Sequence, residues 1–283
     1  MPTDDRRIQA RRITFRYDEE PFPKYFVDDN IAMSHFTAVL SGLFPDGEDF
    51  FVESVREQRA KITDPELKRA VAGFIGQEAI HGREHRQLND RLAELGYPTK
   101  KIEAFTTFIF DNPMPFEPAL WGLANTAALE HFTATFAETL MGRHELRDTL
   151  TTPEVLNTLL WHALEESEHK AVAFDVYRHV GGSERLRRVA MNMTIVGFLG
   201  VCVIATTLSV IGDREARRQP RRVWRDLRAM LRTPLFERGT WDRLRDYNRA
   251  DFHPDDHDAE ALVAEWRERL FGEAGELNDR LAG

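Results

Sequence analysis

The chain has 283 residues, a formal net charge of −9 and a single cysteine, Cys202. This length allows a sizeable core, and 42% hydrophobic with 30% charged residues indicates a folded soluble protein rather than a disordered one. The negative charge argues against nucleic acid as a partner, and one cysteine excludes an internal disulfide framework. The polar N-terminus contains no apolar signal segment, so we expect a cytoplasmic protein.

The order of polar and apolar residues predicts an all-α chain with an N-terminal arm. Residues 1–45 look irregular and are interpreted as a docking arm. Either Thr63 or Asp64 is the expected N-cap of a helix that starts at Pro65. The expected helices run over residues 47–61, 65–95, 118–148 and 153–180. Two helical hairpins of this kind predict a four-helix bundle over residues 46–182.

Residues 183–283 are predicted to form a C-terminal extension with additional helices. Residues 189–212 carry no charge across 24 positions, and eight arginines follow between Arg214 and Arg232. A short amphipathic helix is expected from Ala259 to about Phe271. The extension therefore combines a long apolar helix, an Arg-rich segment and a short amphipathic helix.

The apolar stretch 189–212 is long enough to cross a membrane. Both of its flanks are basic, so the charge bias sets no orientation across a membrane. Polar residues also lower the hydrophobicity of the stretch. We favour a helix packed against the bundle or a second subunit, as in a homodimer, near an apolar substrate path. The protein would then contact an acidic membrane surface peripherally, through residues 189–232. A stable integral span is the alternative.

The motif Glu-x-x-His occurs twice, as Glu78 to His81 and as Glu166 to His169. Residues three apart lie on the same side of a helix, so each pair directs a carboxylate and an imidazole into one space. Both pairs interrupt apolar, core-facing stripes, and buried charges need a compensating partner. Two such pairs, with one glutamate from each of two other helices, form the ligand shell of a di-metal site.

The glutamates of the other two helices are inferred from position. Glu48 and Glu78 are equally far from the turn at Thr63, and Glu48 belongs to an apolar stripe, whereas Glu53 has polar neighbours. Glu48 is therefore preferred over Glu53. On the third helix Glu130 shares a face with small core residues, while Glu138 matches the hairpin level slightly better. We choose Glu130 for its burial and keep Glu138 as the alternative.

Two further histidines lie one helical turn from the motifs. His162 precedes Glu166 and His85 follows His81. Either side chain could supply a third imidazole to the metals. Equally, either could be a core histidine that only supports a ligand.

The motifs resemble those of the ferritin-like di-iron carboxylate superfamily and, more closely, bacterial proteins described as predicted metal-dependent hydrolases. The matching segments are "FPDGEDFF" (44–51), "FIGQEAIHGREH" (74–85), "LEHFTA" (129–134) and "WHALEESEHKAVAFDVY" (161–177). The resemblance extends from about Arg12 to Val180. It implies a ferritin-like bundle with the metal ligands Glu48, Glu78, His81, Glu130, Glu166 and His169. The spacing His162-x-x-x-Glu166-x-x-His169 also resembles di-iron N-oxygenases of arylamines, in which the extra histidine binds iron.

These observations place three functions in order. The first is an oxygen-activating oxidoreductase with two metal ions, iron or else manganese, acting on dioxygen and a small or lipid-like apolar substrate. The second is a two-metal hydrolase. The third is a non-catalytic bundle that binds or handles iron. The sequence identifies neither an electron donor nor a catalytic residue beyond the metal ligands.

Overall fold

The structure, a computed structural model, describes residues 8–18, 22–112 and 118–282. Across these residues the regular structure is helical, apart from an isolated antiparallel bridge between Ile13 and Leu281, which confirms the all-α prediction. The helices are α1 (Ile31–Arg56), α2 (Pro65–Glu94), α3 (Thr99–Asp111), α4 (Trp121–Gly142), α5 (His144–Arg147), α6 (Pro153–His169), α7 (Val172–His179), α8 (Glu184–Gly212), α9 (Arg214–Arg217), α10 (Pro220–Met230), α11 (Arg238–Asp246) and α12 (Glu260–Phe271). Short 3-10 turns occur at Arg59–Lys61, Pro234–Phe236, Pro254–Asp256 and Asn278–Arg280.

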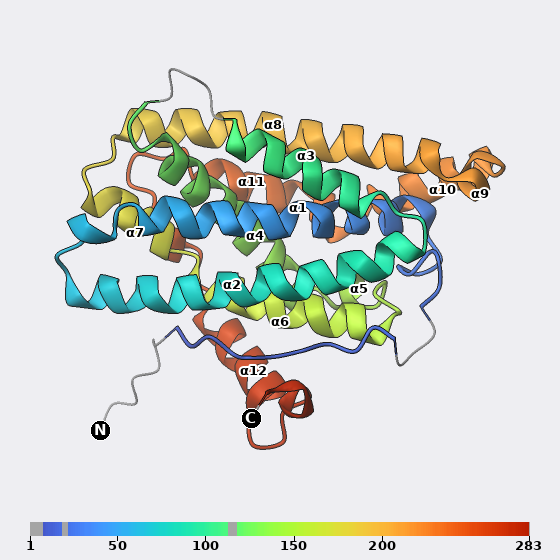
Figure 1. Cartoon of the computed structure of the whole chain (residues 1–283), viewed down its shortest axis with the longest axis horizontal. Coiled ribbons are helices and arrows are strands. Elements are labelled where there is room, and N and C mark those ends of the chain that lie inside the picture. Colours follow the sequence, from blue (N-terminus) through green and yellow to red (C-terminus); the bar gives the residue numbers. More distant parts are fainter. Residues whose placement is uncertain (1–7, 19–21, 113–117, 283) are drawn as a thin grey trace.

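Four long helices pack around a common interior. α1 packs against α2, α4 packs against α6, and the two pairs meet through α1–α4 and α2–α6 contacts. Figure 1 shows α1 and α2 running side by side along the length of the molecule. The apolar core divides into two clusters, one around Trp161 and Leu88 and the other around Phe74 and Phe51. The chain positions between these clusters on α2 and α6 carry the two Glu-x-x-His motifs.

The first helix begins much earlier than the sequence predicted. It starts at Ile31 rather than near Gly47, because Asn30 caps it by accepting a hydrogen bond from the Met33 N–H at 2.8 Å. Pro45 lies inside the helix and has no N–H for the carbonyl of Ser41. The Asn89 side chain on α2 supplies that donor instead, at 2.9 Å. Residues 31–45 therefore belong to α1, and the predicted irregular arm is too long.

Other predicted boundaries differ more modestly. The second helix agrees with the prediction, and Asp64 is its N-cap because its side chain accepts from the Glu66 N–H at 2.8 Å. The predicted third helix ends at Gly142 and is followed by the short α5. The predicted fourth helix is broken after His169 into α6 and α7. α3 was not predicted; it lies against α1 and α2.

The C-terminal extension folds back onto the bundle. α8 packs against α1 and α4, α10 against α1, α11 against α4, and α12 against α6. α8 is long and apolar enough to cross a membrane, yet only 11% of its most apolar window is buried. One face of α8 therefore lies on the bundle, as the favoured prediction had it, and the other is exposed. The described part of the N-terminal arm runs beside α2, α6 and α12 (Figure 1).

A buried arginine fastens the extension to the start of α8. Arg187 is fully buried, donates to the carbonyls of Tyr247 and Arg249, the latter at 2.7 Å, and pairs with Glu184 at 2.7 Å. Its guanidinium also stacks on the Tyr247 ring, 4.8 Å from the centroid. One side chain thus connects α8 to the loop after α11.

We expect Arg187→Ala to lower the free energy of unfolding by about 3 kcal/mol, because the buried Tyr247 carbonyl loses its donor and the Arg249 carbonyl and the Glu184 carboxylate each lose a partner. Urea denaturation followed by circular dichroism measures this change. Arg185→Ala, at an exposed position of the same turn, should stay within about 0.5 kcal/mol of the unaltered protein. Equal effects of the two substitutions would contradict the role given to Arg187.

Candidate metal centre

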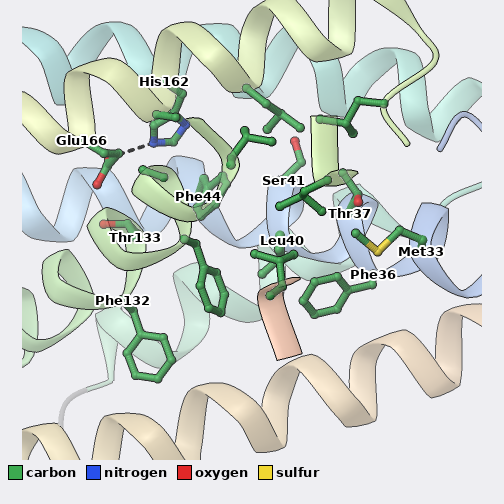
Figure 2. A pocket seen from close by; sticks show the side chains of 18 of the residues that line it. Met33, Phe36, Thr37, Leu40, Ser41, Phe44, Phe132, Thr133, His162 and Glu166 are labelled. Carbon is green, nitrogen blue, oxygen red and sulfur yellow. Dashed lines mark hydrogen bonds and ion pairs between the residues drawn. The ribbon is translucent and has the colours of Figure 1, made fainter. Parts of the chain in front are cut away.

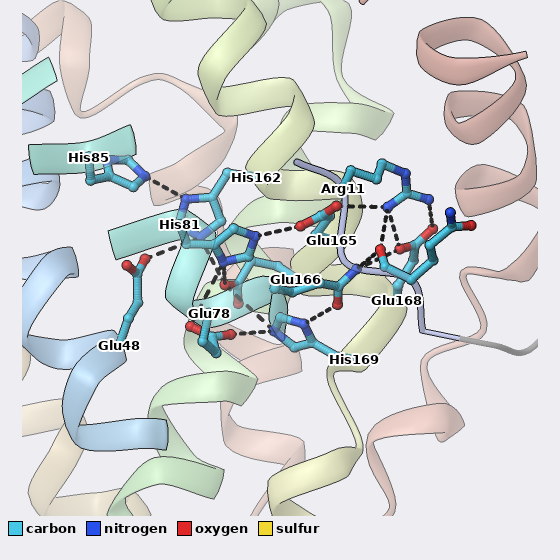
Figure 3. A network of polar contacts seen from close by, with 12 residues as sticks. Arg11, Glu48, Glu78, His81, His85, His162, Glu165, Glu166, Glu168 and His169 are labelled. Carbon is cyan, nitrogen blue, oxygen red and sulfur yellow. Dashed lines mark hydrogen bonds and ion pairs between the residues drawn. The ribbon is translucent and has the colours of Figure 1, made fainter. Parts of the chain in front are cut away.

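The structure brings the six predicted ligand residues into one buried cluster between the four helices, and Figure 3 labels all of them except Glu130. Glu48 comes from α1 and Glu130 from α4, while the two motifs come from α2 and α6. None of the six side chains is more than 3% exposed. The six residues are Glu48, Glu78, His81, Glu130, Glu166 and His169.

Glu166 lies at the middle of the cluster. Its Oε1 is 2.8 Å from His162 Nε2, 3.6 Å from His81 Nδ1 and 3.7 Å from His169 Nε2. His169 Nε2 in turn lies 2.8 Å from Glu78 Oε1 and 3.4 Å from Glu130 Oε2. These distances place imidazole nitrogens and carboxylate oxygens around shared space.

Apart from the ion-pair contacts that they make with one another, most of these inward-facing atoms lack hydrogen-bond partners among the described residues. They are both oxygens of Glu48, Glu78 and Glu130, Oε2 of Glu166, Nδ1 of His81 and Nε2 of His169. A buried polar atom without a partner costs free energy, and a buried carboxylate costs more. Hard oxygen ligands with imidazole nitrogens are the donor set of iron, manganese and zinc. The residues present therefore fit a metal site.

Each motif is supported by the residue that precedes the glutamate of the other motif. His81 Nε2 lies 3.1 Å from Glu165 Oε2, and His169 Nδ1 lies 2.8 Å from Gln77 Oε1. Both contacts occupy the outward nitrogen of the ring and leave the inward nitrogen facing the carboxylates. Acceptors of this kind fix the tautomer and orientation of metal-binding histidines. Neither residue was predicted from the sequence, although a polar residue directly before each motif is a visible signal.

A second layer of charge lies behind Glu165 and Gln77. Arg11 of the N-terminal arm donates to Glu165 at 2.9 Å and to Glu168 at 2.7 and 2.8 Å (Figure 3). Arg267 of α12 also donates to Glu168, at 2.9 Å. Both arginines come from outside the four helices that supply the cluster. No local pattern in the sequence marks them.

A chain of hydrogen bonds assigns different positions to His162 and His85. Asn89 Oδ1 accepts from Ser41 Oγ at 2.8 Å, so the Ser41 oxygen must accept from His85 Nδ1, 3.0 Å away. His85 Nε2 then accepts from His162 Nδ1 at 2.6 Å. This leaves a lone pair on His162 Nε2, which points at Glu166 and, 3.8 Å away, at Glu48. His162 Nε2 thus faces the carboxylates, whereas His85 Nε2 is occupied by His162 in this arrangement, although Glu48, His85 and His162 also lie close enough together to hold a metal ion.

The alternative glutamates lie elsewhere. The Glu53 side chain is 62% exposed and pairs with Arg56 on the protein surface. Glu138 is also buried, but it pairs with Lys170 at 2.9 Å and with Arg243. The structure thus places Glu48 and Glu130, rather than Glu53 and Glu138, in the cluster.

Burial and mutual repulsion shift the ionisation of the metal-free cluster. Burial, followed by the charges of Glu166 and Glu78, raises the pKa of Glu130 to about 8. Burial and then Glu78 raise the pKa of Glu48 well above its ordinary value. Although burial alone would lower it, the surrounding carboxylates raise the pKa of His169 well above its usual range. Burial and neighbouring histidines lower the pKa of both His85 and His162, which are therefore neutral.

Two hollows approach the cluster from different sides. A cavity of about 120 Å³ ends at His162 and Glu166 and is otherwise walled mainly by phenylalanine and leucine, with Thr37, Ser41 and Thr133 as its hydroxyl groups (Figure 2). A second hollow, of about 650 Å³, reaches His169 and is bordered by charged residues such as Asp258. The site can thus be reached from an apolar and from a polar side.

The fold is all-α, and four of its helices bring buried glutamates and histidines together. These features define a helical protein with a candidate metal site. The chain belongs to the family described as predicted metal-dependent hydrolases, whose model matches residues 9–258. This finding agrees with the family resemblance of the motifs. No curated protein and no solved structure matches the chain.

We predict that Glu48→Gln impairs metal binding by roughly tenfold or more, since a neutral amide is a weaker ligand than a carboxylate. Competition with a chromophoric chelator measures the affinity. Glu53→Gln is the matched control on the same helix and should bind metal like the unaltered protein. If only Glu53→Gln impaired metal binding, the assignment of Glu48 as the α1 ligand would be wrong, because the other face of α1 would then face the site.

We also predict the pH dependence of the metal-free protein. The Glu130 carboxyl has a pKa of about 8 in the folded metal-free protein and an ordinary value of 4.5 in the unfolded chain. Between these two pH values the folded state holds the proton and the unfolded state does not, so the free energy of unfolding falls as pH rises. Glu130→Gln removes this group and should flatten the decline in the free energy of unfolding, measured in urea with chelator present. Metal displaces the same proton, so metal affinity should rise with pH over that window. A decline of equal slope in Glu130→Gln would refute the assignment.

Proposed function

We propose that this protein is an enzyme that holds two metal ions between α1, α2, α4 and α6 and acts on a substrate with an apolar chain. The observation that carries the proposal is the set of buried, inward-facing carboxylate and imidazole atoms without hydrogen-bond partners. The polar atoms of an ordinary protein interior are paired, so a cluster of unpaired ones indicates a ligand.

The proposed ligands are the six clustered residues, with His162 as an additional imidazole. Glu166 lies within 3.7 Å of three different histidine rings and is therefore suited to serve both metals. Glu165, Gln77 and His85 are proposed as orienting residues, because each contacts a ligand ring on its outward nitrogen. Their acceptor atoms keep the inward nitrogens free for metal.

Hydrolysis is the reaction class that the family's description supports, and it was placed second on the sequence alone. A metal pair would supply activation of water and polarisation of the bond to be cleaved. The chain's own part would be to hold the apolar portion of an ester or related substrate among Phe36, Leu40 and Phe136, with the reacting group beside His162 and Glu166. The polar hollow at His169 offers a separate route for water.

Oxygen activation with iron or manganese is the second candidate. Two observations favour it: the wall of the inner cavity is almost wholly apolar, and the ligand pattern has one glutamate from each of two helices and Glu-x-x-His from two more. That pattern is the one that di-iron and di-manganese carboxylate bundles use. A relationship to the ferritin-like superfamily belongs to this second proposal.

One pair of assays separates the two reactions. We predict that protein loaded with zinc hydrolyses a medium-chain nitrophenyl ester, since hydrolysis needs no redox-active metal. The iron(II)-loaded protein is tested in parallel for oxygen uptake with a reductant and an aliphatic substrate. Oxygen uptake without ester turnover would reject hydrolysis and assign the second candidate.

Glu166→Ala should abolish either activity, because it removes the central ligand, whereas Glu53→Gln should leave it unchanged. Metal content is measured on the same samples. A Glu166→Ala protein that keeps full metal content and full activity would overturn the whole proposal, whichever reaction the unaltered protein catalyses.

A further inference from the structure

The exposed large apolar side chains gather on one part of the described surface. Apart from Leu281, all of them lie on α3, on α8, or on or directly after α10. They are Phe105, Phe108, Ile109, Val189, Met193, Val196, Val203, Ile204, Leu208, Ile211, Trp224 and Leu231. Figure 1 shows α3 and α8 side by side along one edge of the molecule, with α9 and α10 at the end of α8. Apolar patches of this extent on a soluble protein mark an interaction surface.

The exposed residues of α8 form a single stripe. Successive members from Val189 to Ile211 are three, four or seven residues apart, except for the adjacent pair Val203 and Ile204, so they share one broad face of a helix that is 29 residues long. Val196 is 75% exposed and Leu208 is 62% exposed. The opposite face of α8 is held by the bundle, where Ala190 and Met191 are fully buried. The apolar stripe therefore faces away from the protein along the whole helix.

Basic charge lies at the end of this stripe. Arg214, Arg218, Arg221, Arg228 and Arg232 are exposed and form no ion pair with any residue that the structure describes. Trp224 lies among them on α10 and is 61% exposed. A tryptophan, an apolar helix face and unpaired arginines are the features of proteins that bind anionic lipid surfaces. The protein as a whole is acidic, with a net charge of −9, so the attraction must be local.

The chain on both sides of α8 is joined to the rest of the fold. Asp213, directly after α8, accepts from Lys24 at 2.7 Å and from Tyr25 at 2.9 Å. Further on, Leu281 bridges to Ile13 of the N-terminal arm. Both ends of α8 thus join the same folded body, and the helix lies along the surface of that body.

A cavity lies directly beneath this surface. It has a volume of about 390 Å³ and is lined by Phe105 and Ile109 of α3 and by Met193 and Gly197 of α8, among others. Phe105, Ile109 and Met193 are also among the exposed residues of the patch. The cavity shares Phe44, Phe132, Thr133 and Phe198 with the cavity that ends at His162 and Glu166. The two cavities are thus neighbours that are separated by these shared side chains, so the cavity under the exposed patch lies next to the one that reaches the candidate metal centre.

We propose that the face formed by α3, α8 and α10 docks on an anionic lipid bilayer and that the cavity between α3 and α8 admits a lipid acyl chain. Docking inserts the α8 stripe and the α3 phenylalanines among the lipid chains, while the arginines after α8 contact the phosphate groups. The use of the admitted chain as substrate rests on the proposed function. Docking itself does not depend on the proposed function, so it is measured without enzymatic turnover.

Docking is tested by sedimentation with vesicles of phosphatidylcholine, either pure or mixed equally with phosphatidylglycerol. The full-length protein should sediment with the mixed vesicles, far less with the pure ones, and less again at high salt. Val196→Asp with Ile204→Asp should abolish binding, because both exposed positions would carry charge into the bilayer. Arg221→Glu with Arg228→Glu should weaken binding at least tenfold, since each arginine contributes separately to the attraction.

The matched control is Lys68→Glu with Arg69→Glu, which reverses two exposed charges on α2, away from α8, and should bind like the unaltered protein. Failure to bind mixed vesicles would overturn the proposal. So would a concentration-dependent dimer in analytical ultracentrifugation that the Val196→Asp, Ile204→Asp variant lacks, because the face would then be the interface with a second copy. Extraction requiring detergent rather than high salt and carbonate would overturn it in favour of an integral span.

Entry of a lipid chain is tested by fluorescence. Trp121 lines the cavity and is 9% exposed, whereas Trp224 lies on the docking face. In the Trp224→Phe variant, lipids with brominated chains should quench part of the tryptophan fluorescence. This quenching should be lost when Trp121→Phe is added. Docking without quenching of Trp121 would reject chain entry. Docking and quenching in a protein without enzymatic activity would count against the proposed reaction alone.

Discussion

Burying four glutamate carboxylates in one small volume is the constraint on which this fold depends. Glu48, Glu78, Glu130 and Glu166 come from four different helices, and most of their oxygens have no hydrogen-bond partner. Moving a carboxylate out of water costs several kcal/mol unless a positive charge compensates it. Since neighbouring arginines contact only the outer layer, the inner compensation is left to imidazolium groups or to metal. The apolar clusters on either side hold the helices in place around this costly centre.

The outer layer connects parts of the chain that are far apart in sequence. The ring of His81 on α2 is held by α6, and the ring of His169 on α6 is held by α2, so neither motif is oriented without the other helix. Arg11 and Arg267 neutralise Glu168 from the two ends of the chain. The termini are themselves joined where Ala282 N–H donates to the Arg12 carbonyl at 2.7 Å. The geometry of the site is therefore a property of the closed fold rather than of the four helices alone.

The surroundings of the site differ in polarity from one side to the other. Charged residues border the hollow at His169, whereas aromatic and aliphatic residues wall the cavity at His162 and continue towards α3 and α8. In the proposed function this division separates the path of an apolar substrate from that of water. The proposed docking likewise gives a role to the one strongly basic, apolar segment of a protein with net charge −9. In the proposed orientation that segment faces lipid and the acidic remainder faces water.

Helical periodicity, a local property, was sufficient to predict the all-α class, the two Glu-x-x-His pairs and the preference for Glu48 over Glu53. Each of these follows from which residues share one face of a helix. The tertiary structure decided what depends on distant partners. Asn89 allows α1 to continue through Pro45, the hydrogen-bond chain from Asn89 separates His162 from His85, and Arg11 reaches the site from the arm. These contacts join residues dozens of positions apart, and no pattern within a single helix encodes them.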